Sequence, residues 1–118
     1  MIPLLLLALL QAGPPELHVS VDQDRVSVGD ELLYTARAVS QSSEPMGLTI
    51  APFNGFEIVS RSERTEVSLS GGPTRTTVLE VRLRAVRPGR WQIGPARATQ
   101  GREVVEAAAL VVDVEPTP

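Results

Sequence analysis

Several residue types that enzymes depend on are missing or nearly missing from this 118-residue chain. It has no cysteine, its 11 basic residues are all arginine, and its only histidine is His18. The lack of cysteine excludes disulfides and thiolate zinc sites, and the lack of lysine excludes Schiff-base chemistry. One histidine leaves the commonest general base available only once. We therefore expect a protein that is not an enzyme, with no catalytic residue, no bound metal and no cofactor.

The chain also lacks an excess of basic residues and has few aromatic side chains. The net charge is -3, which argues against a nucleic-acid-binding protein because such proteins carry a strongly basic surface. Aromatic residues make up 3% of the chain, so aliphatic side chains must build most of the core. Hydrophobic residues at 42% and charged residues at 21% are typical of a globular chain, and the length favours one domain.

No apolar run reaches the roughly 20 residues that a membrane-spanning helix needs. The longest run, residues 2–10, has the length of the hydrophobic region of a signal peptide, and the small residues Ala12 and Gly13 follow it. The alternative is a buried strand or helical turn at the N-terminus. We favour a signal peptide over residues 1–12, with cleavage after Ala12 and export to the periplasm or cell envelope.

The rest of the chain alternates between apolar and polar residues with a period of two, which is typical of strands. Turn residues separate the alternating runs at intervals close to 8–12 residues, as in an antiparallel β-sandwich. We predict seven to nine strands in an immunoglobulin-like sandwich over residues 13–115. Residues 103–110 also allow a helical turn because they contain three alanines. Residues 116–118 resemble the start of a linker or a C-terminal tail.

The predicted strands each place one set of side chains toward the core. These sets are Leu17, Val19 and Val21; Leu32, Tyr34, Ala36 and Ala38; Thr65, Val67 and Leu69; Thr77, Leu79, Val81, Leu83 and Ala85; and Leu110, Val112 and Val114. His18 lies on the opposite side of the first strand, where we expect it to be solvated.

Acidic residues near the start of the chain raise the question of a calcium site. Asp22 and Asp24 are followed by Asp30 and Glu31, but the spacing does not match that of an EF-hand loop. Aspartate is also common in β-turns, where it accepts hydrogen bonds from its own backbone. We favour the turn interpretation. The serines form no nucleophile motif such as Gly-x-Ser-x-Gly.

A row of arginines on neighbouring strands is the main candidate for a binding surface. Arg82 and Arg84 share the outward side of the longest strand, and Arg64 lies on the strand before it. The simpler interpretation is a solvated face on which these arginines pair with Glu66 and Glu80, each cross-strand pair contributing about 0.2–1 kcal/mol. The alternative is a face that binds an anionic protein partner.

The only tryptophan, Trp91, has two interpretations. It caps one end of the core near Leu83 and Ile93, which we favour, or it is exposed as a binding hot spot. A carbohydrate- or ligand-binding β-sandwich would expose several aromatic residues on one face. Four aromatic residues in all make that alternative the weaker one.

Three segments follow one another in a recognisable order. Residues 89–96, Gly-Arg-Trp-Gln-Ile-Gly-Pro-Ala, come after the longest predicted strand, residues 19–32 follow the predicted signal peptide, and residues 53–60 contain Phe-Glu-Ile-Val. These segments resemble, respectively, the turn and strand after a long strand, the opening, and the Asp-Phe-Glu-Val segment of the BatD family of bacterial aerotolerance proteins. The order of the segments also agrees, over most of residues 17–114.

The resemblance implies an exported, non-enzymatic immunoglobulin-like module. It further implies a membrane-associated complex with von Willebrand factor A-type proteins and a MoxR-type ATPase system, linked to stress or oxygen tolerance. BatD proteins usually have several domains and a C-terminal membrane span, so we expect this chain to be an N-terminal fragment or a truncated relative. The family supplies no catalytic residues to transfer.

Overall fold

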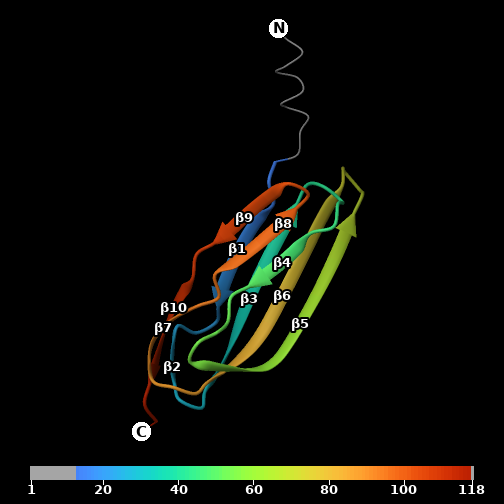
Figure 1. Cartoon of the computed structure of the whole chain (residues 1–118). Coiled ribbons are helices and arrows are strands. Elements are labelled where there is room, and N and C mark those ends of the chain that lie inside the picture. Colours follow the sequence, from blue (N-terminus) through green and yellow to red (C-terminus); the bar gives the residue numbers. More distant parts are fainter. Residues whose placement is uncertain (1–12, 118) are drawn as a thin grey trace.

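The computed structural model describes residues 13–117, and the predicted signal peptide at residues 1–12 lies outside them. The described part contains ten strands and no helix (Figure 1). The strands are β1 (Glu16–Val21), β2 (Arg25–Ser27), β3 (Glu31–Ser40), β4 (Gly47–Ile50), β5 (Phe56–Ser68), β6 (Thr74–Ala85), β7 (Gly89–Ile93), β8 (Ala96–Gln100), β9 (Glu103–Ala107) and β10 (Leu110–Glu115). The all-β prediction is confirmed, and residues 103–110 are extended, not helical.

One layer is a four-stranded antiparallel sheet in the order β1-β3-β6-β5. The other layer consists of two three-stranded sheets, β4-β8-β9 and β2-β10-β7, in which β2 pairs with β10 in parallel. Figure 1 shows β4, β8 and β9 lying across the face of the four-stranded sheet. If β7–β8 and β9–β10 are each taken as one bent strand, these orders are those of the immunoglobulin sandwich.

Two breaks in the second layer explain why ten strands are present where seven to nine were expected. Residues 94 and 95 separate β7 from β8, and residues 108 and 109 separate β9 from β10. Gly94 has a φ of 63°, and Pro95 lacks a backbone N–H for a ladder hydrogen bond. The long hairpin of the second layer therefore bends halfway along its length.

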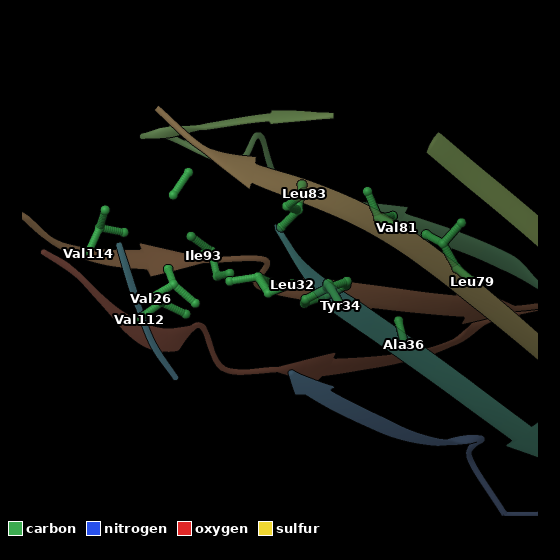
Figure 2. Close-up of a cluster of buried hydrophobic side chains, with 11 residues drawn as sticks. Val26, Leu32, Tyr34, Ala36, Leu79, Val81, Leu83, Ile93, Val112 and Val114 are labelled. Atoms are coloured by element: carbon green, nitrogen blue, oxygen red, sulfur yellow. The ribbon is translucent and has the colours of Figure 1, made fainter. Parts of the chain in front are cut away.

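The core lies between the two layers and is mainly aliphatic (Figure 2). The predicted inward sets on β3 and β6 are confirmed, and Val112 and Val114 on β10 are buried with them. Tyr34 is the largest fully buried side chain, and its ring meets that of Phe53 edge-on at 5.1 Å between centroids. The aliphatic core and this single aromatic pair match the scarcity of aromatic residues in the sequence.

The predicted burial of Thr65, Val67 and Leu69 is wrong. The register places Thr65 opposite the buried Thr77, so β5 does turn this set toward the core side of the sheet. Val67 is nevertheless 49% exposed and Leu69 73% exposed. The reason is visible in Figure 1: β5 is the outermost strand of its sheet and no strand of the second layer crosses it.

Candidate functional site

The three candidate partner-binding residues lie on the outer face of the four-stranded sheet. Arg82 and Arg84 are on β6, and Arg64 is on the edge strand β5. They share this face because the register aligns Arg64 with Val78 and Ser60 with Arg82. The side chains of all three are between 42% and 64% exposed.

Each of the three arginines faces a carboxylate. Arg84 Nη2 lies 3.0 Å from Glu31 Oε2, and its Nη1 lies 3.3 Å from Glu57 Oε1. Arg64 Nη1 lies 3.3 Å from Glu80 Oε1. Arg82 makes a looser pair at 4.0 Å, again with Glu31. The face is therefore a row of alternating charges, which we call the Arg–Glu row, and not a stripe of free positive charge.

The sequence predicted that arginines would pair with acids on this face, but it identified only one of the acids. Glu80 was predicted, whereas Glu66 makes no ion pair with a described residue. Glu31 and Glu57 were missed. They lie directly opposite Arg84 on the two strands that flank β6, and that placement requires the strand order and register.

The ion pairs of the Arg–Glu row contribute little to stability. Exposed ion pairs contribute about 0–1 kcal/mol because water screens them. Beside the row, Arg64 and Glu80 also border an open depression of about 340 Å³ on the same face. Its other lining residues are Thr35, Arg37, Glu66, Thr76 and Val78. The face can therefore present ordered donors and acceptors to a polar protein surface at little cost to folding.

Two of the acidic residues that raised the calcium question accept hydrogen bonds from backbone N–H groups. Asp22 Oδ1 accepts a hydrogen bond from the Leu33 backbone N–H at 2.8 Å, and Asp30 Oδ2 accepts one from Ser27 N–H at 2.9 Å. The turn interpretation is thus confirmed for Asp30, whose partner is three residues away, whereas Asp22 joins the end of β1 to β3 through a residue 11 positions away. In residues 13–117, no three His, Cys, Asp or Glu side chains are grouped closely enough to hold a metal ion.

His18 lies on the exposed outer side of β1, as predicted. Its Nε2 is 3.8 Å from Glu16 Oε2, a carboxylate two residues earlier on the same strand. Both side chains are more than 70% exposed, so the pair is surrounded by water. This arrangement gives the histidine no buried partner that would orient it for proton transfer.

Trp91 is half-buried and packs against the core, as favoured from the sequence. Its indole lies over Gly55, where any side chain would collide with the ring, and its Nε1–H donates a hydrogen bond of 3.0 Å to the Arg87 carbonyl. Phe53 and Phe56 also pack against the core. The aromatic residues therefore form no exposed platform of the kind that carbohydrate-binding sandwiches use.

Among residues 13–117 there is no helix of the length and apolarity needed to cross a bilayer. The fold and the charged sheet face define the class: an immunoglobulin-like β-sandwich module with an open polar face on its four-stranded sheet. The chain belongs to the BatD family, since the family model described as "BatD DUF11 like domain" matches residues 19–114. The comparison with curated proteins yields no significant match. The family resemblance inferred from the motif at residues 89–96 is thereby confirmed.

Proposed function

We propose that this chain is an exported, non-enzymatic module that binds other proteins in a cell-envelope complex linked to stress or oxygen tolerance. Family membership over residues 19–114 supports the proposal, because the resemblance implies such a complex. Within that setting the partners are von Willebrand factor A-type proteins and the associated MoxR-type ATPase system. The module extends over residues 13–115, follows a cleaved signal peptide at residues 1–12, and continues into a linker or tail at residues 116–118.

The observation that carries the proposal is the Arg–Glu row on the outer face of the four-stranded sheet. The opposite face of β1, β3 and β6 is packed against the second layer, whereas Arg82 and Arg84 remain 47% and 42% exposed. Polar surfaces with arginine are common in protein interfaces, where charge complementarity sets specificity and association rate. Arg64, Arg82 and Arg84 are the residues we expect to contact the partner.

The test is capture of partners from bacterial envelope extracts by the folded chain and by a double variant, Arg82→Glu with Arg84→Glu. The matched control is Arg90→Glu with Arg97→Glu on the second layer. These two arginines also pair with acids, Asp113 at 3.1 Å and Glu106 at 3.2 Å. Both double variants change the net charge equally, so a difference between them reports the position of the charge.

We expect the first variant to lose most of the captured partner and the control to keep it, with both variants folded by circular dichroism. Equal capture by both variants would place the interface elsewhere. Recovery of no partner by the folded wild-type chain would contradict an interaction role. For export, N-terminal sequencing of the envelope-localised protein should begin at Gly13, and a protein retaining Met1 in the cytoplasm would contradict it.

A further inference from the structure

The edge strand β5 combines three features that the Arg–Glu row does not explain. It is 13 residues long, it pairs with β6 on one side only, and every residue from Glu57 to Ser68 is exposed. Edge strands of this length carry unpaired backbone N–H and C=O groups and are ordinarily shortened, covered or blocked. Figure 1 shows β5 at the outer limit of the sheet with no strand beyond it.

Exposed apolar side chains concentrate at this edge. Of the seven large hydrophobic residues that are exposed in the described part of the chain, three lie on β5 and one follows it in the turn to β6. These four are Ile58, Val59, Val67 and Leu69. The strand thus offers apolar contact area next to its free backbone groups.

The charges on β5 are self-complementary in two antiparallel registers. Pairing about Thr65 would place Arg64 opposite Glu66, but Arg64 is already held by Glu80 at 3.3 Å, so we favour the register centred on Ser62. When two copies pair about a twofold axis at Ser62, the midpoint of the strand, Arg61 of each copy lies opposite Glu63 of the other. Pairing about Glu63 or Arg64 would instead place like charges together, which is destabilising. Regular pairing about Ser62 covers residues 60–64, and the irregularity between Ile58 and Ser60 interrupts it on either side.

Arg61 and Glu63 are available for such pairing. Neither forms an ion pair within 4.0 Å with any residue of the segment 13–117, whereas Arg64 on the same strand is already held by Glu80 at 3.3 Å. Both belong to the side of β5 that faces the core layer but is not covered by it, since Arg61 aligns with Val81 and Glu63 with Leu79. Two such pairs across the axis would satisfy all four charges.

We propose that two copies of this chain associate through antiparallel pairing of their β5 strands, forming one continuous eight-stranded sheet. The occupant of the free edge is a second copy because the charge pattern fits its own antiparallel image and because a twofold arrangement uses the same patch on both chains. The charges keep the edge from pairing with arbitrary strands. Self-association needs no envelope partner, so it stands or fails independently of the function proposed above.

The test is sedimentation velocity over a concentration series on the chain of residues 13–118, which keeps every core residue found buried in the described part of the chain. The variants are Arg61→Glu, Glu63→Arg and the double exchange. Each single variant replaces two opposite-charge pairs across the axis by two like-charge pairs, so we expect dimerisation to weaken about tenfold or more. The double exchange restores opposite charges and should recover dimerisation to within a few-fold of wild type.

Arg37→Glu is the control, because Arg37 is an exposed arginine on β3, away from the β5 edge, and forms no ion pair with a described residue. Its dimerisation should equal that of the wild type. A wild-type chain that stays monomeric at millimolar concentration would overturn the proposal. A dimer that the single variants do not weaken, or that the double exchange does not restore, would overturn it equally, and so would association into open-ended fibres.

Discussion

The hydroxyl of Tyr34 donates a hydrogen bond of 2.6 Å to the backbone carbonyl of Gly94, and this bond joins the two layers of the sandwich. The two residues are 60 positions apart in the chain. Gly94 marks the bend between β7 and β8, so the bond satisfies a buried carbonyl at the point where the second layer interrupts its own ladder. The tyrosine thus serves as a buried apolar ring and as the donor that the bend requires.

Removing that donor should destabilise the fold. In Tyr34→Phe the Gly94 carbonyl is left buried without its partner, which costs about 1–3 kcal/mol in the free energy of unfolding. Urea unfolding at pH 7 measures the loss. An unchanged unfolding midpoint would show that the hydroxyl contributes nothing there.

The same tyrosine should make stability fall in strong alkali. Burial raises the pKa of Tyr34 from 10.0 to about 12, so between these values the folded chain holds a proton that the unfolded chain releases. The contribution of the neutral Tyr34 to the free energy of unfolding is therefore complete below pH 10 and is lost as the pH rises through 12. The chain has no lysine, no cysteine and one tyrosine, so no other side-chain type titrates in this window.

The measurement is urea unfolding at several values between pH 9 and 12, with Tyr34→Phe as the control. We expect the wild type to lose stability with increasing pH and the variant to stay nearly constant. A parallel decline in both proteins would assign the effect to some other cause.

A side chain at Gly94 should be poorly tolerated. A Cβ there would collide with the Tyr34 ring and hydroxyl, and the φ of 63° is itself unfavourable for other residues. Gly94→Ala should cost about 3 kcal/mol or more, because strain at the positive φ alone costs about 1–3 kcal/mol. Gly29→Ala is the control, since Gly29 also has a positive φ but a Cβ there would meet no atom within 4 Å beyond its chain neighbours. Equal losses, measured by urea unfolding, would show that the collision is relieved without cost.

Truncation of two leucines of the β5–β6 hairpin should change the free energy of unfolding by very different amounts. Leu79 is fully buried, so Leu79→Ala creates a cavity and should cost about 2–5 kcal/mol. Leu69 is 73% exposed, and Leu69→Ala should change the free energy of unfolding by less than about 0.5 kcal/mol in the monomer. Urea unfolding at low protein concentration compares them. A large loss for Leu69→Ala would mean that something covers the hairpin.

A buried glutamine ties the loop after β3 to β8. Gln100 accepts a hydrogen bond from the Ser40 hydroxyl and donates one of 2.8 Å to the Glu44 carbonyl. Gln100→Ala should cost about 1–3 kcal/mol because these groups lose their partners in a buried site. Gln92→Ala, at an exposed position of β7, should cost less than about 0.5 kcal/mol. Urea unfolding, together with faster amide exchange in residues 41–46 for the first variant only, would check this assignment.

Much of the fold could be predicted from alternation alone. The strict period of two in β3 and β6 identified Leu32, Tyr34, Leu79 and Leu83 as core residues, and all four are buried. Alternation reports which side of a sheet a residue faces, and that depends only on the local backbone. It correctly placed Val67 on the core side of β5 as well, but it could not reveal that the second layer stops short of this strand.

The candidate site was harder to predict for a related reason. The sequence placed Arg64, Arg82 and Arg84 on one face, because their spacing and the intervening turn are local features. It did not identify Glu31 or Glu57 as partners of Arg84, since these come from strands 53 and 27 residues away. Ion pairing across strands is decided by register, and register is set by packing of the whole sheet.

The amino-acid sequence by itself therefore determined the class of fold, the aliphatic core and the family, because each follows from residue types and their short-range order. Only the tertiary structure decided that the Arg–Glu row is charge-balanced, that Tyr34 meets Gly94, and that β5 is an uncovered edge. These three features depend on which distant segments become neighbours. Which segments become neighbours depends on how all the strands pair and pack together, and no single segment determines it.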